Sequence, residues 1–395
     1  MKKYILIFIF IFFILIFSIA CLQNTGNEYY NVLMYKNNEQ RTGFYDTAGV
    51  PVLHGIKWKI EVDGDHAINL LYNGILYFSR SIPFAVDAET GKEKFKPNFF
   101  SGCLYNIIVI GYEYLEKKLN RSFSGWNLDT KEKIWENKYI KNIDSELIHK
   151  DILYVVTRDE GSGGDPSRYV IYLVNPMTGE ILEKIEPNLY IYGIAFWEDN
   201  FIFTSGDGLY KIDFSQLSKR HNPIKIFETK EGKILRTNQK EAEPNTTKTL
   251  PVISNNCVYF GDYVENLFSL NLKTNKINWQ KKFEDSFYES VSIYEGIIYL
   301  INNDKIYYLK ESNGDILFSK ENEKFTPGNE IAITKDGIYF ASSDGILYSL
   351  DRKTGKELWN LKLAKRCMAS PIISNGVIYI PVFDTLKKGY IFAIY

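Results

Sequence analysis

The sequence predicts an all-β chain folded as an eight-bladed β-propeller, with four antiparallel strands in each blade. Two observations support this prediction. A unit of short strands and polar turns recurs along the chain, and most copies end in a large aromatic residue. Neighbouring copies are mostly about 40 residues apart, a period typical of four-stranded propeller blades. One unit is too thin to bury its own apolar faces, so the copies have to stack on one another.

The clearest copy occupies residues 337–359. A β-branched and aromatic run over residues 337–341 predicts one strand, and Asp344-Gly345 provides the tight turn that returns the chain as a second strand over 346–350. The polar turn at 353–356 contains a glycine that can adopt left-handed backbone angles, and a third strand follows it. The unit therefore predicts three strands and two turns.

The residue that ends the second of these strands is a landmark for counting the copies. Eight landmarks are found, at Asp87, Asp129, Asn175, Asp213, Asn271, Lys310, Asp351 and the chain end Tyr395. The closing aromatic recurs at Phe95, Trp135, Trp279, Phe318 and Trp359. We expect the repeated aspartate to accept backbone N–H bonds from the turn that follows it, which is a structural role.

These residues resemble the PQQ-like, or quinoprotein-type, β-propeller repeat. The turns at 86–92 and 350–356 are the most similar in sequence, because both contain Asp-x-x-Thr-Gly-Lys. The resemblance covers residues 32–395 and implies that each closing tryptophan docks onto the neighbouring blade. It also implies that residues 34–43 form the lead-in to the first blade.

A strand without a blade of its own is predicted at residues 56–62, where apolar and charged residues alternate. The eighth copy, at 376–395, stops after its hairpin and lacks a closing aromatic. We therefore predict that Trp58 and its strand complete the eighth blade. Pairing the two ends of the array would remove the open sheet edges that an unclosed ring exposes.

The first 21 residues are predicted to be a lipoprotein signal peptide, because two lysines precede an unbroken apolar run that is short for a membrane span. Ile19-Ala20-Cys21 resembles a bacterial lipobox, which implies lipidation of Cys21. Ser18 stands where leucine is usual, which leaves open cleavage by a general signal peptidase or an uncleaved anchor. Residues 22–31 are polar and are expected to be a tether.

The composition is that of an ordinary globular chain, with 45% hydrophobic and 24% charged residues among 395. A formal net charge of −1 gives no sign of the excess positive charge that nucleic-acid binding proteins carry. Length alone would suggest two or three domains, but a propeller uses about 40 residues per blade in one closed body. We expect a single monomeric propeller.

The sequence gives little indication of chemistry. If Cys21 is lipidated, three scattered cysteines remain, and we expect them to be small buried residues: Cys103, Cys257 and Cys367. The histidines are far apart and lack metal-ligand spacing: His54, His66, His149 and His221. The vicinal cysteine pair of the quinone-dependent alcohol dehydrogenases of this repeat is missing. We therefore predict no metal, no cofactor and no enzymatic activity.

Two insertions depart from the repeat. Residues 158–168 lengthen a hairpin of the third blade, and residues 215–248 lengthen the connection between the fourth and fifth blades, with an outer strand expected at 224–227. Long connections in compact domains are usually functional or disordered. We predict that residues 159–167 and 237–248 contact a protein partner.

The side chains named for this contact are Asp159, Glu160, Asp165, Lys240, Glu241 and Glu243. The three acidic residues of the first loop could instead surround a hard cation, although their spacing matches no calcium loop. Both insertions could also be tolerated surface loops.

The anchor, repeat and length together resemble the lipid-anchored BamB-like scaffold proteins, which support insertion of β-barrel proteins into the outer membrane. This resemblance implies a non-enzymatic scaffold whose partner is the barrel-assembly machine, anchored at the outer membrane and facing the periplasm in a diderm organism. Two alternatives stay open. One is a surface lipoprotein that binds a protein or a small ligand, and the other is a degenerate PQQ-dependent dehydrogenase.

Overall fold

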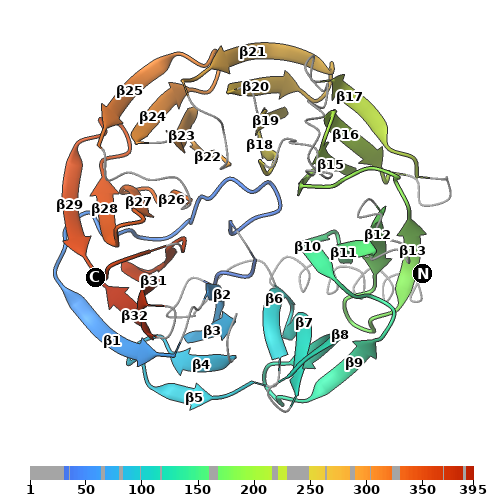
Figure 1. Ribbon diagram of the computed structural model, residues 1–395, viewed down its shortest axis with the longest axis horizontal. Coiled ribbons are helices and arrows are strands. Elements are labelled where there is room, and N and C mark those ends of the chain that lie inside the picture. Colours follow the sequence, from blue (N-terminus) through green and yellow to red (C-terminus); the bar gives the residue numbers. More distant parts are fainter. Residues whose placement is uncertain are drawn as a thin grey trace, which may run out of the picture.

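The computed structural model describes residues 31–395 apart from 35, 64–66, 80–82, 98, 116–117, 160–167, 216–220, 229–248, 263–264, 285–289, 303, 323–329, 368 and 386–387. Within this part of the chain, eight four-stranded antiparallel sheets form a closed ring (Figure 1). The predicted eight-bladed propeller is confirmed. A search of the described residues for an apolar helix with the length of a membrane span finds none.

The blades follow one another along the chain, and each runs from its innermost to its outermost strand. Blade one contains β2 (Ala67–Tyr72), β3 (Ile75–Ser79), β4 (Phe84–Asp87) and β5 (Glu93–Phe95), and blade two contains β6 (Phe99–Tyr105), β7 (Ile108–Leu115), β8 (Lys118–Asn127) and β9 (Lys133–Asn137). Blade three contains β10 (Ile143–His149), β11 (Ile152–Asp159), β12 (Arg168–Val174) and β13 (Ile181–Ile185), and blade four contains β14 (Gly193–Trp197), β15 (Asn200–Ser205), β16 (Gly208–Asp213) and β17 (Ile224–Glu228).

The second half of the ring continues the same order. Blade five contains β18 (Val252–Ser254), β19 (Cys257–Gly261), β20 (Asn266–Asn271) and β21 (Lys276–Lys282), and blade six contains β22 (Ser292–Tyr294), β23 (Ile297–Asn302), β24 (Lys305–Lys310) and β25 (Ile316–Glu321). Blade seven contains β26 (Ala332–Ile333), β27 (Ile338–Ala341), β28 (Ile346–Leu350) and β29 (Glu357–Lys362). Blade eight contains β30 (Ile372–Ser374), β31 (Val377–Thr385), β32 (Lys388–Ile394) and β1 (Ile56–Val62).

The N-terminal strand closes the ring as predicted. Strand β1 pairs antiparallel with the C-terminal β32, with Trp58 opposite Ala393, and becomes the outermost strand of blade eight. The indole Nε1 of Trp58 donates a 2.9 Å hydrogen bond to the carbonyl oxygen of Ala88 in blade one. One strand therefore completes the last blade and joins it to the first.

Two other closing tryptophans, Trp135 and Trp279, dock in the same way, whereas Trp359 donates to the carbonyl of Val50 in the segment before β1. The indole of Trp135 donates to the carbonyl of Pro176 in blade three at 2.9 Å, and that of Trp279 donates to Glu311 in blade six at 2.9 Å. Each acceptor directly follows the landmark residue of the next blade. The predicted docking of these aromatic side chains between blades is confirmed.

Buried tyrosines add a second contact between blades. The second strand of six blades carries one, at Tyr77, Tyr154, Tyr259, Tyr299, Tyr339 and Tyr379. The hydroxyl of Tyr299 donates to the carbonyl of Arg352 at 2.9 Å. The hydroxyl of Tyr379 donates to Ala88 at 3.3 Å, the same acceptor that Trp58 uses. At the seam between blades eight and one, tyrosine and tryptophan thus share the first turn residue of the next blade.

The landmark residues hold their turns as expected. The Asp351 carboxylate accepts the backbone N–H groups of Lys353 at 3.0 Å and Thr354 at 2.7 Å. The landmark of blade two was predicted wrongly as Asp129. Strand β8 ends at Asn127, whose side-chain oxygen accepts the N–H groups of Asp129 and Thr130, so Asp129 lies inside the turn.

Residues 32–55, which include the predicted lead-in at 34–43, cross the centre of the ring (blue in Figure 1) and are called the strap below. The strap bonds in turn to successive blades, with backbone bonds Val32–Leu71, Glu39–Phe196, Gln40–Ile253, Thr42–Ile293, Gly43–Ile333 and Ala48–Gly376. Three charged strap side chains add further contacts. Lys36 donates to the carbonyl of Val291 at 2.9 Å, Arg41 donates to that of Glu146 at 3.0 Å, and Glu39 pairs with His149 at 2.7 Å. The strap is therefore a structural part of the propeller.

All three cysteines in the described part of the chain are free thiols. Cys103 and Cys367 are buried, as predicted. Cys257 is only partly buried, because it begins the second strand of blade five beside the turn, where the amide of Asn278 lies 3.2 Å from its sulfur.

Candidate protein-binding face

The two faces of the ring carry different connections. Because neighbouring strands are antiparallel, the turns between strands one and two and between strands three and four of a blade lie on one face. The hairpins between strands two and three, and the connections to the next blade, lie on the other. The strap bonds to the first turn of blade eight at Gly376, and Asn31, directly before the strap, bonds to the first turn of blade one at Asn73. We therefore call the first face the strap face.

The first insertion and the part of the second that follows β17 leave from the opposite face, which we call the insertion face. The part of the second insertion before β17 joins strands three and four of blade four on the strap face. Strand β11 ends at Asp159 and β12 begins at Arg168, so the first insertion joins strands two and three of blade three. Strand β17 ends at Glu228 and β18 begins at Val252, so the second leads from blade four to blade five. The predicted outer strand of blade four is confirmed as β17.

Few of the residues predicted to contact a partner fall within the described part. Asp159 ends β11, where its backbone pairs with Arg168. The others lie outside the described residues: Glu160, Asp165, Lys240, Glu241 and Glu243. Cys21 and the whole predicted signal peptide lie outside them too. The predicted contacts and the lipidation therefore stay predictions.

A cluster of aromatic and charged side chains lies at the root of the first insertion, and we call it the Tyr–Arg patch: Asp144, Arg158, Tyr169, Tyr190 and Tyr192. The Nε of Arg158 donates to the Asp144 carboxylate at 3.3 Å, and its guanidinium carbon lies 5.7 Å from the centre of the Tyr169 ring. The ring centres of Tyr169 and Tyr190 are 5.7 Å apart, and Tyr190 stacks on Tyr192 with an interplanar angle of 4°. Four separate segments of the chain build this patch.

The charges of the patch are fixed at neutral pH. Burial and the nearby Asp144 carboxylate raise the pKa of Tyr169 to about 12, so its hydroxyl stays protonated. Burial lowers the pKa of Arg158, but Tyr169 and Asp144 outweigh that effect and raise it overall. The Arg158 side chain is 44% exposed and that of Asp144 is 32% exposed. A charged guanidinium beside the Tyr169 ring is therefore open to solvent.

Two further groups lie toward the same face of the ring. Tyr139, on the connection that enters blade three, is the most exposed large hydrophobic side chain among the described residues, at 83%. In blade four, Asp207 accepts hydrogen bonds from Tyr210 at 2.9 Å and from Lys225 at 2.6 Å. These residues lie at the second-to-third hairpin and the outermost strand, between the roots of the two insertions.

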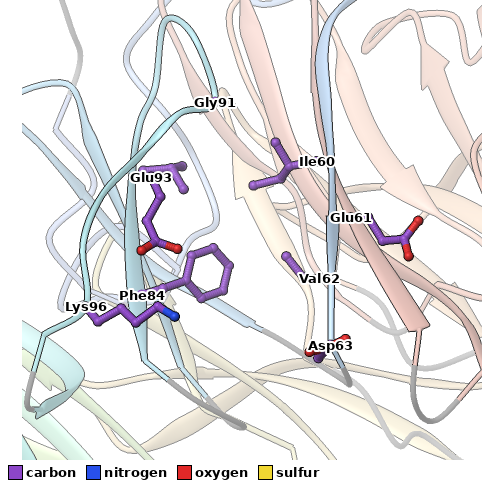
Figure 2. Close-up of a pocket in the computed structure, with 9 residues that line it drawn as sticks. Ile60, Glu61, Val62, Asp63, Phe84, Gly91, Glu93 and Lys96 are labelled. Carbon is purple, nitrogen blue, oxygen red and sulfur yellow. The ribbon is translucent and has the colours of Figure 1, made fainter.

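A groove opens where the ring closes, between β1 and blade one (Figure 2). We call it the seam groove. Its volume is about 310 Å³, and its lining includes the apolar side chains of Ile60, Val62, Phe84 and Val86. Figure 2 shows Ile60 and Phe84 pointing toward each other across it, whereas Glu61 points away.

The described residues contain no group of three or more His, Cys, Asp or Glu side chains that could hold a metal ion. His149 pairs with Glu39 and stacks on Phe196 at 4.1 Å between ring centres. His221 pairs with Glu183 at 2.7 Å. Both histidines thus make structural hydrogen bonds to a carboxylate at the edge of the aromatic core.

Comparison with known proteins points to one repeat family. The PQQ_2 family model, described as "Outer membrane protein assembly factor BamB", matches residues 220–385. The matched stretch runs from the outermost strand of blade four to the second strand of blade eight, and its repeats are similar to those of this family. The predicted resemblance of these PQQ-like repeats to the BamB-like family is confirmed. The outer membrane protein assembly factor BamB of Moranella endobia is 25% identical to this propeller over 140 residues, which are 35% of this chain and 36% of that protein.

Solved structures resemble the PQQ-like propeller over most of its length. BamB from Moraxella catarrhalis superposes with a TM-score of 0.61 and 11% identity, covering 86% of this chain and 99% of that one. The quinohemoprotein alcohol dehydrogenase ADHIIG from Pseudomonas putida HK5 gives a TM-score of 0.69 and 10% identity, covering 92% and 80%. At these identities the likeness shows the fold alone, and the alignment to the Moranella endobia protein spans about a third of its length.

Proposed function

We propose that this propeller is a non-enzymatic, lipid-anchored scaffold of the cell envelope that binds a protein partner through its insertion face. In an organism with an outer membrane, the partner belongs to the machinery that assembles β-barrel proteins there. The support for this partner is the similarity to proteins named outer membrane protein assembly factor.

The observation that carries the proposal is the Tyr–Arg patch, together with the exposed Tyr139 on a connection of the same face. Tyrosine, tryptophan and arginine are the residue types that most often dominate the binding energy of protein interfaces. Tyr139 and Tyr190 lie on connections between blades, where they are not needed for strand pairing. The connections from β11 to β12 and from β17 to β18 also leave from this face. This face therefore presents an aromatic surface beside the ends of two long connections.

The opposite face has less freedom to bind a partner. The strap lies on it and bonds to the ends of the innermost strands. The chain also enters the propeller there, since the side chain of Asn31 accepts the N–H of Asn73 at 3.1 Å. A tether of residues 22–30 reaches at most about 30 Å when extended. An anchor at Cys21 would then attach the propeller from the strap-face side and leave the insertion face open.

A non-enzymatic role also agrees with the chemistry of the centre. The strap directs Lys36 and Arg41 to carbonyl groups of the innermost segments, and both side chains are buried. His149 and His221 are each paired with a carboxylate. The likeness to the alcohol dehydrogenase concerns the fold, and no second function is proposed from it.

The proposal is tested by affinity purification of the tagged, full-length protein from solubilised membranes of its own organism. The variant is Tyr139→Ala combined with Arg158→Glu. It should lose most of its co-purifying partner while its melting temperature stays close to that of the wild type. The matched control is Lys353→Glu, an exposed charge reversal on the strap face, which should keep the partner.

The partner band is identified by mass spectrometry. Equal recovery of the same partner with the insertion-face variant and with the control would contradict the proposed binding face. A partner that is recovered normally but is unrelated to outer-membrane assembly would leave the binding face standing and refute the assembly role.

A further inference from the structure

The exposed large apolar side chains of the propeller gather toward one face. Among the described residues, every one of them except Tyr139 lies on the strap-face side of the ring. Single exposed apolar residues are ordinary on protein surfaces, but a random scatter would place them on both faces. Val52 belongs to the strap, Ile107 and Met177 lie in turns, and Tyr395 ends the chain beside the first residues of β1.

The rest of the set stands at the start of the outermost strands. Each outermost strand begins at the strap face, because it runs antiparallel to strand three, which ends there. In seven of the eight blades its first or second residue is an exposed isoleucine or leucine. These strands follow the circumference of the ring (Figure 1). We call these side chains the apolar rim: Ile56, Ile134, Leu182, Ile224, Ile277, Ile316, Leu317 and Leu358.

The fold does not require an apolar residue at these positions. In β29, Leu358 lies at a break in the pairing register directly before the closing aromatic, and Leu317 lies at the same break in β25. Such a bulged residue has no partner across the ladder. Blades eight and one carry Lys57 and Lys94 at the corresponding break. Because lysine is accepted there, the isoleucine and leucine of the other blades need a reason outside the ladder.

The opposite ends of the same strands are polar. At or next to their insertion-face ends, the outermost strands of blades three to eight carry an exposed charged side chain, at Lys184, Glu228, Lys282, Glu321, Lys362 and Glu61. On β29, Leu358 and Lys362 are separated by about 13 Å along the strand. The outer wall of the ring thus changes from apolar to charged between the strap face and the insertion face.

We infer that the strap face rests on a lipid bilayer, with the apolar rim at the level of the lipid headgroups and the insertion face turned away from the membrane. This inference rests on the proposed lipid anchor. The chain enters the propeller at the strap face, and the tether of residues 22–30 would hold that face within about 30 Å of the bilayer.

The distribution of the rim argues for a lipid surface as its partner. A rim that follows nearly the whole circumference fits a broad, flat surface, whereas a protein partner covers one continuous patch. Binding to a membrane surface grows with the apolar area that enters the headgroup region. Long lysine side chains such as Lys57 and Lys94 can keep their charge in water while their methylene groups lie along apolar surface.

The test measures how close each face lies to lipid. The full-length protein is purified with its anchor from membranes of its own organism and reconstituted in phosphatidylcholine vesicles that contain a doxyl-labelled lipid. Cys257→Ser removes the partly exposed thiol, and a bimane fluorophore is attached through Lys353→Cys on a strap-face turn or Lys362→Cys on β29. We expect the lipid to quench the label at position 353 at least about threefold more than the label at position 362.

A pair of variants tests the rim itself, with the label at position 353. Leu317→Asp combined with Leu358→Asp should lower the quenching to about a third, because the apolar contact with lipid is lost. The matched control is Ser319→Asp combined with Asn360→Asp, two positions further along the same strands, where both side chains are exposed. The control should keep the wild-type quenching.

Vesicle flotation separates failure of the anchor from failure of the inference. A labelled protein that does not float with the vesicles would refute the anchor and the inference together. A protein that floats but shows equal quenching at positions 353 and 362 would overturn the inference and leave the anchor standing. Quenching that survives the two leucine substitutions in a folded protein would also overturn it.

Discussion

Replacing Trp135 with alanine should be one of the most damaging single changes in the ring. The indole is 7% exposed, meets Phe123 edge to face at 5.6 Å, and donates to Pro176 of the next blade. The substitution therefore removes a large apolar side chain, an aromatic contact and a hydrogen bond between blades together.

The magnitude follows from these contacts. Truncating a buried tryptophan to alanine costs about 3 to 5 kcal/mol, including the cavity that remains. Trp135→Phe keeps most of the buried ring but leaves the Pro176 carbonyl without its donor, so we expect a loss of about 1 to 2 kcal/mol. Trp359 is only partly buried, although it donates to the carbonyl of Val50 in the strap at 2.7 Å. Trp359→Ala should therefore cost less than Trp135→Ala.

The assay is urea unfolding of the purified protein, followed by far-ultraviolet circular dichroism. Tyr139→Ala is the control, because an aromatic side chain that is 83% exposed should change the unfolding free energy by less than about 0.5 kcal/mol. The expected order of stability is Tyr139→Ala, Trp135→Phe, then Trp135→Ala. If Trp135→Ala unfolded at the same urea concentration as the Tyr139→Ala control, the docking of aromatic side chains would not hold the blades together.

Three further predictions concern the turns and the anchor. Gly179→Ala should destabilise the protein by about 2 kcal/mol or more, because the backbone φ is 72° and an added Cβ would lie 2.4 Å from the Trp135 ring. Gly296→Ala, where φ is 77° and the space is open, should cost only about 1 kcal/mol. Thermal unfolding of both variants measures the difference. The side-chain hydrogen bond from Thr354 lowers the pKa of Asp351 in the folded protein. The ionised carboxylate therefore stabilises the fold above its ordinary pKa near 4, and this stabilisation is lost as the pH falls further. The difference in unfolding free energy between wild type and Asp351→Asn should shrink from pH 6 to pH 2, and a constant difference would refute the charge effect. Metabolic labelling with a palmitate analogue should mark the wild type and be lost in Cys21→Ala, and an unlabelled wild type would exclude the anchor.

Much of the fold could be predicted because its information is repeated along the sequence. The Asp-x-x-Thr-Gly-Lys turns and closing aromatics recur, so each copy supports the placement of the others. The closure by Trp58 was predictable as well, since the last copy lacks its outer strand and an unassigned strand stands near the start. The error at Asp129 arose because that turn offers two candidates, and only the strand end at Asn127 decides between them.

The candidate sites carried much weaker signals. The Tyr–Arg patch joins Asp144, Arg158 and Tyr190, which are far apart in sequence and meet only through the ring geometry. The bonds of the strap to successive blades use backbone groups, which no residue type reveals. The apolar rim had one usable signal, an isoleucine or leucine directly before three of the closing aromatics, as at Leu358.

Site-specific photo-crosslinking in living cells tests the central claim most directly. A benzophenone amino acid is placed at Tyr190 on the insertion face and, in a parallel protein, at Lys353 on the strap face. The proposed function predicts a crosslinked protein partner from position 190 and none, or much less, from position 353. Crosslinks to the same partner from position 353, with none from position 190, would contradict binding through the insertion face.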